Sequence, residues 1–422
     1  MRIVSLKKEE FDNFAIHYKN NNYFQSSNYA EFLKETEGYE IHYLGYVDNN
    51  GNLFGASLML YKTLFFGYKY AYSPRGLLID YTNIEMVREV TIALKKLLKK
   101  QKFIFVKIDP LIVASERDKE GNTIKFNNVV NAILSEFKSL NYEHLGFNLY
   151  NESVLPRWYV SARLNNDARI IYNNFSQDIK EKIAYANSMA FSVNYDNSGN
   201  IDRFYEFIKN SNIKKSKKYF QSLFNSFNPK VKIFYAYLDT KKYVSNANKL
   251  YNIEEEKNRN LGEIIQSGNT VKYNIQKAIN DKITSDKMLN FYKKDIVSST
   301  KLLKMHPEGI ICGAALTIEE ANGVNILINY EDPNYSRNNI STILTYEIMK
   351  FFGKMNYKYI NLGSITGNFS STSKYYPLLL SKLGFNSSIL EYIGEFNIII
   401  NPFMYKIYKK REEKKASKNN KK

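Results

Sequence analysis

Few residues of this chain are of the types that form covalent intermediates or bind metal ions. The single cysteine, Cys312, lies in the apolar run 310–315, where a small side chain in a buried strand is expected. One cysteine also excludes an intrachain disulfide and a cysteine-based metal cage. Four histidines are scattered without a metal-ligand spacing: His17, His42, His144 and His306. Any chemistry would therefore depend on holding two substrates together and stabilising developing charge.

The helices and strands that would position such substrates can be predicted in the first part of the chain. Apolar residues at a spacing of three or four predict helices, and short apolar runs beside Asn/Gly turns predict strands. Ser27 or Asn28 is the predicted N-cap of the first helix, and Asp109-Pro110 ends the last strand. The predicted elements are a helix over 29–36, a hairpin of strands 41–47 and 53–61, a helix over 84–98, and a buried strand over 103–108.

The same order recurs in the second part of the chain, which indicates an internal duplication. The predicted elements there are strands over 233–238, 309–318 and 324–330, a helix over 340–352, and a strand over 357–362. Strands, a central helix and then a strand with a ligand-binding C-terminal end resemble the GNAT acyltransferase fold, present twice. The predicted fold class is α/β (α+β).

A long polar insertion separates the paired strands of the second unit. Residues 241–305 lack proline and carry apolar residues at regular helical spacing, interrupted near Ser267-Gly268-Asn269. This pattern predicts two antiparallel helices that form a coiled-coil arm. Thirteen Lys/Arg against seven acids give the arm a net charge of +6, which is compatible with RNA and does not require it.

The segment before the second central helix lacks a binding loop for coenzyme A. GNAT enzymes that use acetyl-CoA hold its pyrophosphate on bare amides of a glycine-rich loop at a helix N-terminus. Here the stretch 337–342 reads Arg-Asn-Asn-Ile-Ser-Thr, with Ile340 and Thr342 where glycines belong. Branched side chains would block a phosphate, so the expected acyl donor is something other than CoA.

The charge of +18 over 422 residues indicates a polyanionic partner, although lysine-rich composition contributes to it throughout. Residues 409–422 hold eight Lys/Arg and two Glu, and we expect this basic tail to be disordered. The N-terminus is charged too early for a signal peptide, and no apolar run reaches 18 residues. The predicted location is cytoplasmic, peripheral at the membrane face.

Seven short motifs, in order from about residue 24 to 408, together resemble the FemABX peptidoglycan aminoacyltransferases. They are Phe24-Gln25-Ser26 with Tyr29-Ala30 and Lys34, Tyr43-Leu44-Gly45, Pro74-Arg75-Gly76, Lys107-Ile108-Asp109-Pro110, Pro156-Arg157-Trp158, Ser381-Lys382-Leu383-Gly384-Phe385-Asn386, and Glu391-Tyr392-Ile393-Gly394-Glu395-Phe396.

The resemblance implies an enzyme that moves an amino acid from aminoacyl-tRNA to an amine of the stem peptide of lipid II or UDP-MurNAc-pentapeptide. The tRNA ester is already activated, so no cofactor is expected beyond aminoacyl-tRNA as co-substrate. A family paralogue or a second copy of the chain, and contact with the inner membrane face, are further implied partners.

The resemblance also assigns roles to five residues. Lys382 would face the reacting ester or the oxyanion, although Ser381 replaces an aromatic residue of the motif. Asp109 would bind the acceptor ammonium or take its proton; alternatively it makes a turn with Pro110. The three substrate-binding candidates are Lys34 and Lys180, expected near the precursor's diphosphate, and Arg75, expected at a phosphate or stem-peptide carboxylate.

Some of these assignments have open alternatives. Lys34 reads equally as a solvated helix lysine, and Arg75 could brace the fold. Lys180 and Lys182 stand where the family has an arginine followed by an asparagine, and lysine lacks bidentate phosphate geometry. Two rival functions remain: an N-acyltransferase with another acyl donor, and a catalytically decayed protein that binds RNA or a membrane surface.

The predicted domains follow from this duplicated organisation. The first unit covers 1–150 and is completed by 391–408, the second covers 151–240 and 306–390, the arm covers 241–305, and the tail covers 409–422.

Overall fold

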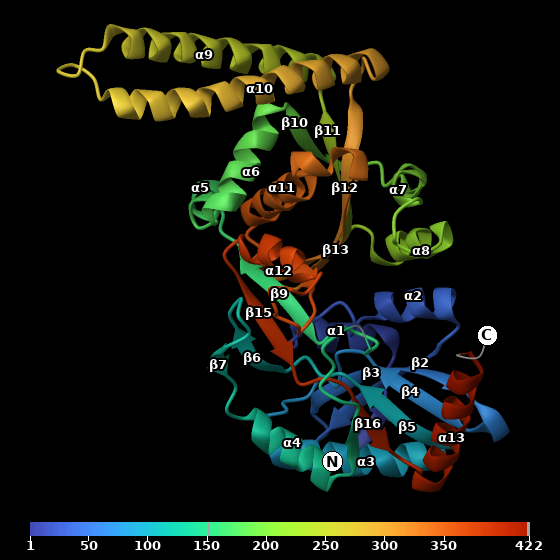
Figure 1. Ribbon diagram of the computed structural model, residues 1–422. Helices are drawn as coiled ribbons and strands as arrows, with labels where there is room; N and C mark the ends of the chain where they lie inside the picture. Colours follow the sequence, from blue (N-terminus) through green and yellow to red (C-terminus); the bar gives the residue numbers. More distant parts are fainter. Residues whose placement is uncertain (151, 420–422) are drawn as a thin grey trace.

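The computed structural model describes residues 1–150 and 152–419, with the side chains of 336–338 and 419 also left undescribed. The molecule contains two mixed sheets and a long helical arm that projects from the second (Figure 1). Among the described residues no helix is both long enough and apolar enough to cross a membrane.

The first sheet has seven strands and is covered by helices on both faces. Its central helix, α3 (Ile84–Lys100), connects the parallel strands β4 and β5. In spatial order the strands are β1 (Arg2–Ser5), β2 (Glu40–Val47), β3 (Leu53–Thr63), β4 (Lys69–Ser73), β5 (Phe103–Ile108), β16 (Phe396–Ile399) and β8 (Tyr142–His144). The other helices of this unit are α1 (Lys8–His17), α2 (Ser27–Glu37), α4 (Val130–Ser139) and α13 (Pro402–Asn419).

The second sheet has nine strands and repeats the arrangement of the first. Its central helix, α11 (Ile340–Lys354), connects the parallel strands β13 and β14. In spatial order the strands are β10 (Phe191–Asp196), β11 (Val231–Leu238), β12 (Ile310–Glu320), β13 (Gly323–Glu331), β14 (Tyr359–Ser364), β9 (Trp158–Arg163), β15 (Ser387–Tyr392), β6 (Val113–Arg117) and β7 (Thr123–Phe126). The helices are α5 (Ala168–Asn173), α6 (Gln177–Ser188), α7 (Ile201–Ile208), α8 (Lys217–Phe227) and α12 (Tyr376–Leu383).

The helices and strands predicted from sequence periodicity are confirmed, with one error at an N-cap. The Oγ of Ser26 accepts a hydrogen bond from the backbone N–H of Tyr29, so Ser26 caps α2. The prediction of Ser27 or Asn28 was wrong because the helix begins two residues earlier than the apolar pattern. The Ser27 hydroxyl instead donates to Asp12.

Three large apolar cores and a smaller cluster between α13 and β5 lie within the described residues. One lies under α3 in the first sheet and one under α11 in the second. The third joins the two units: Phe11 and Phe32, from helices on the first sheet, belong to the same buried cluster as Phe204, Phe220 and Tyr235 of the second unit. Figure 1 shows α2 and α8 facing each other across this contact.

Each sheet contains strands from distant parts of the sequence, so the sheets alone do not define the domain limits. The predicted limits stay a prediction. β6 and β7, which come from the first 150 residues, pair in the second sheet. β16, from the segment 391–408, pairs between β5 and β8 in the first sheet.

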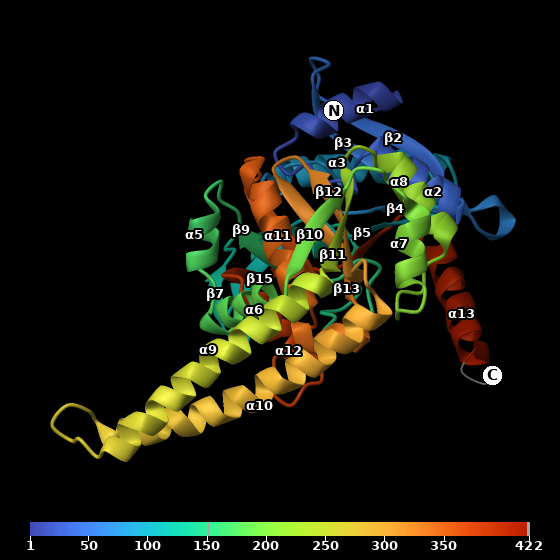
Figure 2. The same cartoon turned by 90° about the horizontal axis from the view of Figure 1, so that it is seen from above.

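The predicted arm is confirmed as the antiparallel helices α9 (Thr240–Ser267) and α10 (Ile275–Met305), seen side by side in Figures 1 and 2. Its interface is partly polar. Asn258 donates to Ser285 and to Asp286, and Lys282 donates to the Asn258 side-chain oxygen. These bonds fix the register of the two helices where apolar contacts are few.

The basic tail is helical as far as it is described, contrary to the expected disorder. α13 runs to Asn419, and residues 420–422 lie outside the described part of the chain. Lys, Glu, Arg and Ala favour helix, and the Lys415–Glu412 and Lys409–Glu143 ion pairs support it. Composition alone missed this helix because charge was counted without periodicity.

Candidate active site

The parallel strands of the second unit separate soon after they pair. β13 and β14 are in register only from Gly323 to Asn325 and from Tyr359 to Asn361, although both strands continue further. Two cavities, of about 470 and 440 Å³, lie where the strands have separated. They share four lining residues: Ile326, Leu327, Gly363 and Ser364. The two cavities therefore meet at the end of β14.

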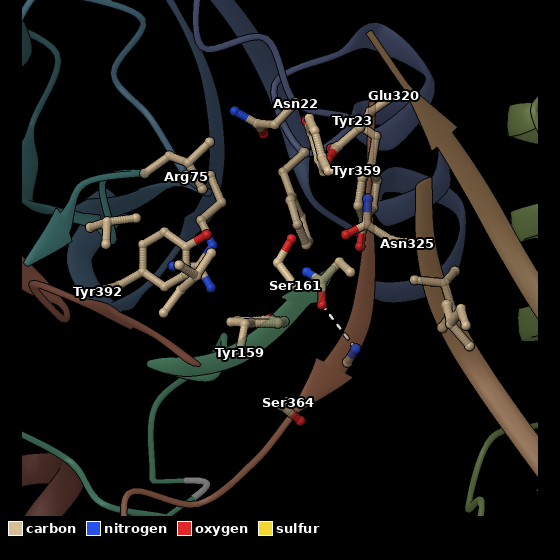
Figure 3. A pocket seen from close by; sticks show the side chains of 18 of the residues that line it. Asn22, Tyr23, Arg75, Tyr159, Ser161, Glu320, Asn325, Tyr359, Ser364 and Tyr392 are labelled. Carbon is tan, nitrogen blue, oxygen red and sulfur yellow. Dashed lines mark hydrogen bonds between the residues drawn. The ribbon is translucent and has the colours of Figure 1, made fainter. Parts of the chain in front are cut away.

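The first cavity lies between the two units and is rich in aromatic side chains. Figure 3 shows tyrosines from both units around it, with Arg75 on one side and Glu320 on the other. The aromatic lining residues are Tyr23, Phe24, Tyr159, Tyr359 and Tyr392. Such a wall suits a ligand that carries apolar surface with a few polar groups.

Arg75 is fixed in the wall of this cavity. Its guanidinium donates to the Pro156 carbonyl oxygen at 2.8 Å and lies 4.8 Å from the Tyr392 ring centre and 5.4 Å from that of Tyr159. Its backbone N–H donates to Asp109 Oδ1 at 2.6 Å. The side chain is only 4% exposed, so Arg75 presents a preorganised, partly shielded positive charge.

Asp109 lies behind Arg75 and does not line either cavity. Its carboxylate accepts hydrogen bonds from the Tyr72 hydroxyl and the Arg75 backbone. Burial raises the pKa of Asp109 to about 6, although the Arg75 charge opposes the shift. The structure therefore brings two predicted site residues together, with Asp109 in position to orient Arg75.

Glu320 is a site residue that sequence reasoning missed. It ends β12, lines the first cavity and accepts a hydrogen bond from the Tyr359 hydroxyl at 3.2 Å. Burial raises the pKa of Glu320. In the sequence, Glu319-Glu320 before the turn at Ala321 reads as a solvated strand end. In the structure Tyr359 of its own unit and Tyr23 of the first unit lie around Glu320.

Lys382 lines the second cavity. It comes from the last turn of α12, and its Nζ donates to the carbonyl oxygen of Ser364 at 2.9 Å. Burial lowers the pKa of Lys382 to about 8. Gly363 lets the ammonium approach: it has a φ of +91°, and a Cβ there would lie 3.2 Å from Lys382 Nζ.

The N-terminus of α11, next to Lys382 in the second cavity, is already occupied by a carboxylate of the protein. Glu331 from β13 accepts a hydrogen bond from the Ser341 backbone N–H at 2.9 Å. Ile340 and Thr342 are buried there. A phosphate at this helix N-terminus would meet the Glu331 carboxylate and two branched side chains, so the site does not suit the pyrophosphate of CoA. The side chains of residues 336–338, in the same segment, lie outside the described part of the structure.

Lys34 and Lys180 lie away from both cavities. Lys34 is exposed on α2 and pairs with Glu31 at 3.5 Å. Lys180, on α6, donates to the carbonyl oxygen of Asn173 at 2.8 Å. The structure does not bring these two lysines together with Arg75, Asp109 or Lys382.

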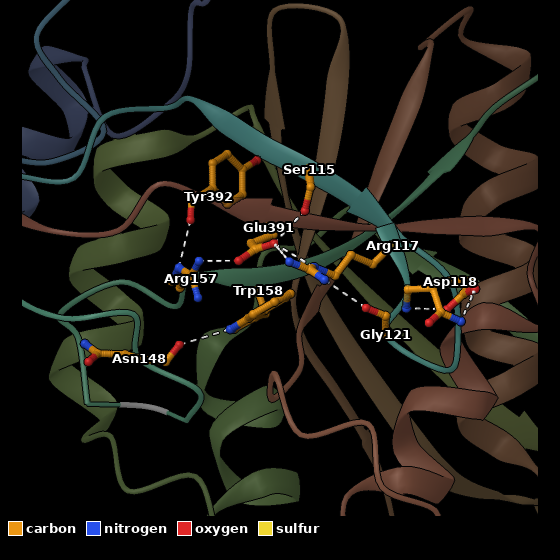
Figure 4. Close-up of polar contacts among 10 residues, drawn as sticks. Ser115, Arg117, Asp118, Gly121, Asn148, Arg157, Trp158, Glu391 and Tyr392 are labelled. Atoms are coloured by element: carbon orange, nitrogen blue, oxygen red, sulfur yellow. Dashed lines mark hydrogen bonds and ion pairs between the residues drawn. The ribbon is translucent and has the colours of Figure 1, made fainter. Parts of the chain in front are cut away.

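Two motifs of the sequence meet in a buried ionic cluster behind the first cavity (Figure 4). The Arg157 guanidinium pairs with the Glu391 carboxylate and donates to the Tyr392 carbonyl oxygen at 2.9 Å. Glu391 also accepts from Ser115 and from Arg117. The cluster connects β9, β15 and β6, and it holds Tyr392 in the cavity wall.

Comparisons with known proteins agree with this architecture. The sequence matches the FemAB family over residues 6–412. It is 24% identical to the aminoacyltransferase FemA of Staphylococcus epidermidis, over 97% of this chain and 98% of that protein. FemB of the same species is also 24% identical, over 97% of each chain. The crystal structure of FemX superposes with a TM-score of 0.72 at 20% identity, over 96% of this chain and 99% of that chain. The predicted tandem GNAT-like fold is thereby confirmed.

Proposed function

This chain belongs to the FemAB family and is an aminoacyltransferase, and on that premise we propose that it transfers an amino acid from aminoacyl-tRNA to a peptidoglycan stem peptide. The acceptor would be an amine of lipid II or UDP-MurNAc-pentapeptide, and the product would extend an interpeptide bridge. The reaction is direct aminolysis of the tRNA ester, without a covalent enzyme intermediate.

The observation that carries the proposal is the junction of two cavities at Gly363 and Ser364. A transferase without a nucleophile has to bring donor and acceptor into contact. We assign the aminoacyl ester to the cavity that contains Lys382 and the stem peptide to the cavity that contains Arg75. The acceptor amine then reaches the ester carbonyl across the end of β14.

Lys382 would stabilise the oxyanion of the tetrahedral intermediate. The neutral amine nitrogen forms a bond to the ester carbon, and the carbonyl oxygen takes up negative charge. The carbonyl then reforms as the bond to the tRNA ribose oxygen breaks, the nitrogen loses a proton, and the ribose oxygen leaves as a hydroxyl group. A well-placed donor at the oxyanion contributes about 3–4 kcal/mol. The Ser364 carbonyl holds the Lys382 ammonium at this junction before substrate arrives.

The acceptor amine has to lose a proton before it attacks. A lysine amine has a pKa near 10.4, so roughly one molecule in a few thousand is neutral at pH 7. We assign the binding of the ammonium to the cavity-facing carboxylate of Glu320, and the binding of a stem-peptide carboxylate to Arg75. Asp109 orients Arg75. Because Asp109 does not line the cavity, it could accept a proton only by way of its hydrogen-bond partners, the Tyr72 hydroxyl and the Arg75 backbone N–H.

Lys34 and Lys180 remain candidates for the precursor's diphosphate, because both carry a positive charge outside the cavities. Lysine would bind it as a point charge, without the bidentate geometry of arginine. Neither lysine lines either of the two cavities, which suits a group that is bound but does not react.

The proposal is tested with purified protein, separately charged tRNAs, and lipid II or UDP-MurNAc-pentapeptide. The stem-peptide mass should rise by one amino-acid residue with at least one charged tRNA. The same mixture with uncharged tRNA plus the free amino acid is the control and should show no gain. Absence of a mass gain with every charged tRNA and both acceptors would contradict the proposal.

A further inference from the structure

One face of α13 carries a phenylalanine followed by four lysines at helical spacing. Successive steps of three, four, four and four residues place them on one face of the helix, spread over about 120° around its axis. We call this face the lysine stripe: Phe403, Lys406, Lys410, Lys414 and Lys418. All five side chains are exposed, and Phe403 is 71% exposed. Met404 and Tyr405 point the other way and pack on Ile104 and Phe105 of β5.

The charges of the stripe are not neutralised by the protein. Within the described part of the chain, none of its four lysines forms an ion pair. The helix's two paired lysines, Lys409 and Lys415, bind Glu143 and Glu412 and lie off the stripe. Glu412 lies on the opposite side of the helix, whereas Glu413, three residues after Lys410 and seven after Lys406, borders the stripe. The four lysines outnumber this one carboxylate, so the stripe presents a net positive face to solvent.

A second exposed ring, Phe66, lies beside α13 in the turn between β3 and β4. It is 76% exposed and has a φ of +55°, a conformation that a residue with a Cβ rarely adopts. The Arg411 guanidinium lies 4.0 Å from the Phe65 ring centre and 5.6 Å from that of Phe66, which connects the turn to the helix. A phenylalanine that is both solvent-exposed and left-handed is unfavourable for stability, so a binding role explains it better.

We propose that the lysine stripe and Phe66 form a docking surface for an anionic lipid bilayer. Lysines near a bilayer attract acidic headgroups, and exposed aromatic rings enter the interface between headgroups and acyl chains. Neither ring alone would anchor the protein, but rings together with a polybasic face supply the two signals that stable peripheral binding needs.

The surface fits a bilayer better than RNA. Single-stranded RNA is bound in a positively charged groove with aromatic platforms, whereas Phe66 and Phe403 line neither of the cavities described above. α13 lies on the outside of the first unit, at the other side of the molecule from the arm (Figures 1 and 2). The inference deepens the proposed function by assigning a surface for membrane contact, and its test needs neither tRNA nor precursor.

The test is co-sedimentation of the full chain with vesicles of phosphatidylcholine, with and without phosphatidylglycerol. We expect binding only to the anionic vesicles. The K410Q/K414Q/K418Q variant should lose about fivefold in affinity for each lysine removed. The F66N/F403Q variant should lose roughly tenfold or more, and it should stay folded because asparagine tolerates the left-handed conformation.

Matched controls come from the arm. K277Q/K287Q/K301Q removes three exposed lysines of α10, and V297Q removes a side chain that is 70% exposed there. Both should bind vesicles like the unmodified chain. The stripe variants should also keep their transfer activity toward the water-soluble UDP-linked acceptor, which separates this inference from the proposed function.

Three results would overturn the inference. The first is no binding, or equal binding to neutral and anionic vesicles. The second is an equal loss in the arm controls. The third is a stripe variant that loses affinity for an RNA hairpin while its vesicle binding is unchanged, which would assign the surface to RNA.

Discussion

The two units share one order of elements but differ at the parallel strand pair that flanks the central helix. In the first unit β4 and β5 stay paired over five positions, and β16 pairs with the other edge of β5. In the second unit β13 and β14 pair over three positions and then separate. The first sheet is thus closed where the second opens into two cavities. A duplicated scaffold can therefore carry one reaction centre, with the closed copy serving as its wall.

The polar groups at the two strand ends follow the same division. In the closed unit, Asp109 after β5 is bound by Tyr72 and by the Arg75 backbone, inside the protein. In the open unit, the carbonyl of Ser364 at the end of β14 is bound by Lys382, beside a cavity. In the closed unit the polar group at the strand end orients Arg75, and in the open unit it holds the Lys382 ammonium beside the cavity.

The largest loss of stability is expected at the ionic cluster of Arg157, Glu391 and Arg117, because it holds together the strands that separate the closed unit from the open one. Arg157→Met removes the more deeply buried of the two guanidinium groups that pair with the Glu391 carboxylate. We expect a loss of about 3–5 kcal/mol in the free energy of unfolding, measured by urea denaturation. Arg163→Met, at the exposed last residue of β9, the strand that follows Arg157, is the control and should change stability by less than about 0.5 kcal/mol. Equal stability of the two variants would show that the cluster is not structural.

Loss of the charge in the open unit should stop turnover while leaving the fold intact. For Lys382→Gln we expect kcat to fall about 10²- to 10³-fold with little change in KM, because the donor acts on the oxyanion. Lys374→Gln, on the exposed loop before α12, should keep normal kinetics in the same transfer assay. A variant that lost only substrate affinity would place Lys382 in binding and not in the chemical step.

A plot of kcat against pH should fall on both sides of an optimum, with the alkaline fall set by Lys382 of the open unit and the acidic fall set by Asp109 of the closed unit. Lys382, with a pKa of about 8, acts as a cation, so activity should fall as the pH rises through 8. Asp109, with a pKa of about 6, orients Arg75 as a carboxylate, so activity should fall as the pH drops through 6. Asp109→Asn should remove the acidic limb and keep the alkaline one. An acidic limb that persisted in this variant would belong to Glu320.

The same two pKa values make opposite contributions to stability. The pKa of Asp109 is raised on folding, so the folded state holds more protons and loses stability as the pH rises from about 4 to 6. The pKa of Lys382 is lowered, so the unfolded state holds more protons and the folded state gains stability as the pH rises above 8.

The smallest expected effects come from the two central helices, which are capped differently. The N-cap Asn83 of α3 accepts from Met86 through its own side chain, whereas α11 depends on Glu331 from the neighbouring strand. Asn83→Ala and Glu331→Ala should each reduce the free energy of unfolding by about 1 kcal/mol, measured by thermal or urea unfolding. A gain in stability for Glu331→Ala would mean that the carboxylate is held there for ligand binding and not as a cap.

The sequence was sufficient to predict the helices and strands, and two of the residues it singled out, Arg75 and Lys382, line the cavities. Periodicity predicted α3 and α11 because each buries one apolar face, and the branched residues at Ile340 and Thr342 predicted the absence of a CoA loop. The pairing of Arg75 with Asp109 could not be predicted, because it joins residues 34 positions apart through the fold. Glu320 was missed for the same reason: the groups around it, such as Tyr23 and Tyr359, are distant in the sequence.

The helix at the C-terminus shows a second limit of sequence reasoning. A count of charges predicted a disordered tail, but the spacing of Phe403 and the lysines after it is helical. The helix could have been predicted from the positions of these residues, but the total charge of the segment does not contain that information. For Lys34 and Lys180 the reverse holds: the motif drew attention to them, and the structure leaves both on the surface.

The exchange of strands between the sheets has a consequence for biogenesis. β16 occupies an interior place in the first sheet, between β5 and β8, yet it is contributed by residues 396–399. During synthesis the first sheet stays incomplete, with the edge of β5 unpaired, until residues 396–399 have left the ribosome. The two units therefore cannot fold one after the other as independent domains, and we expect slow, chaperone-sensitive folding with a high contact order.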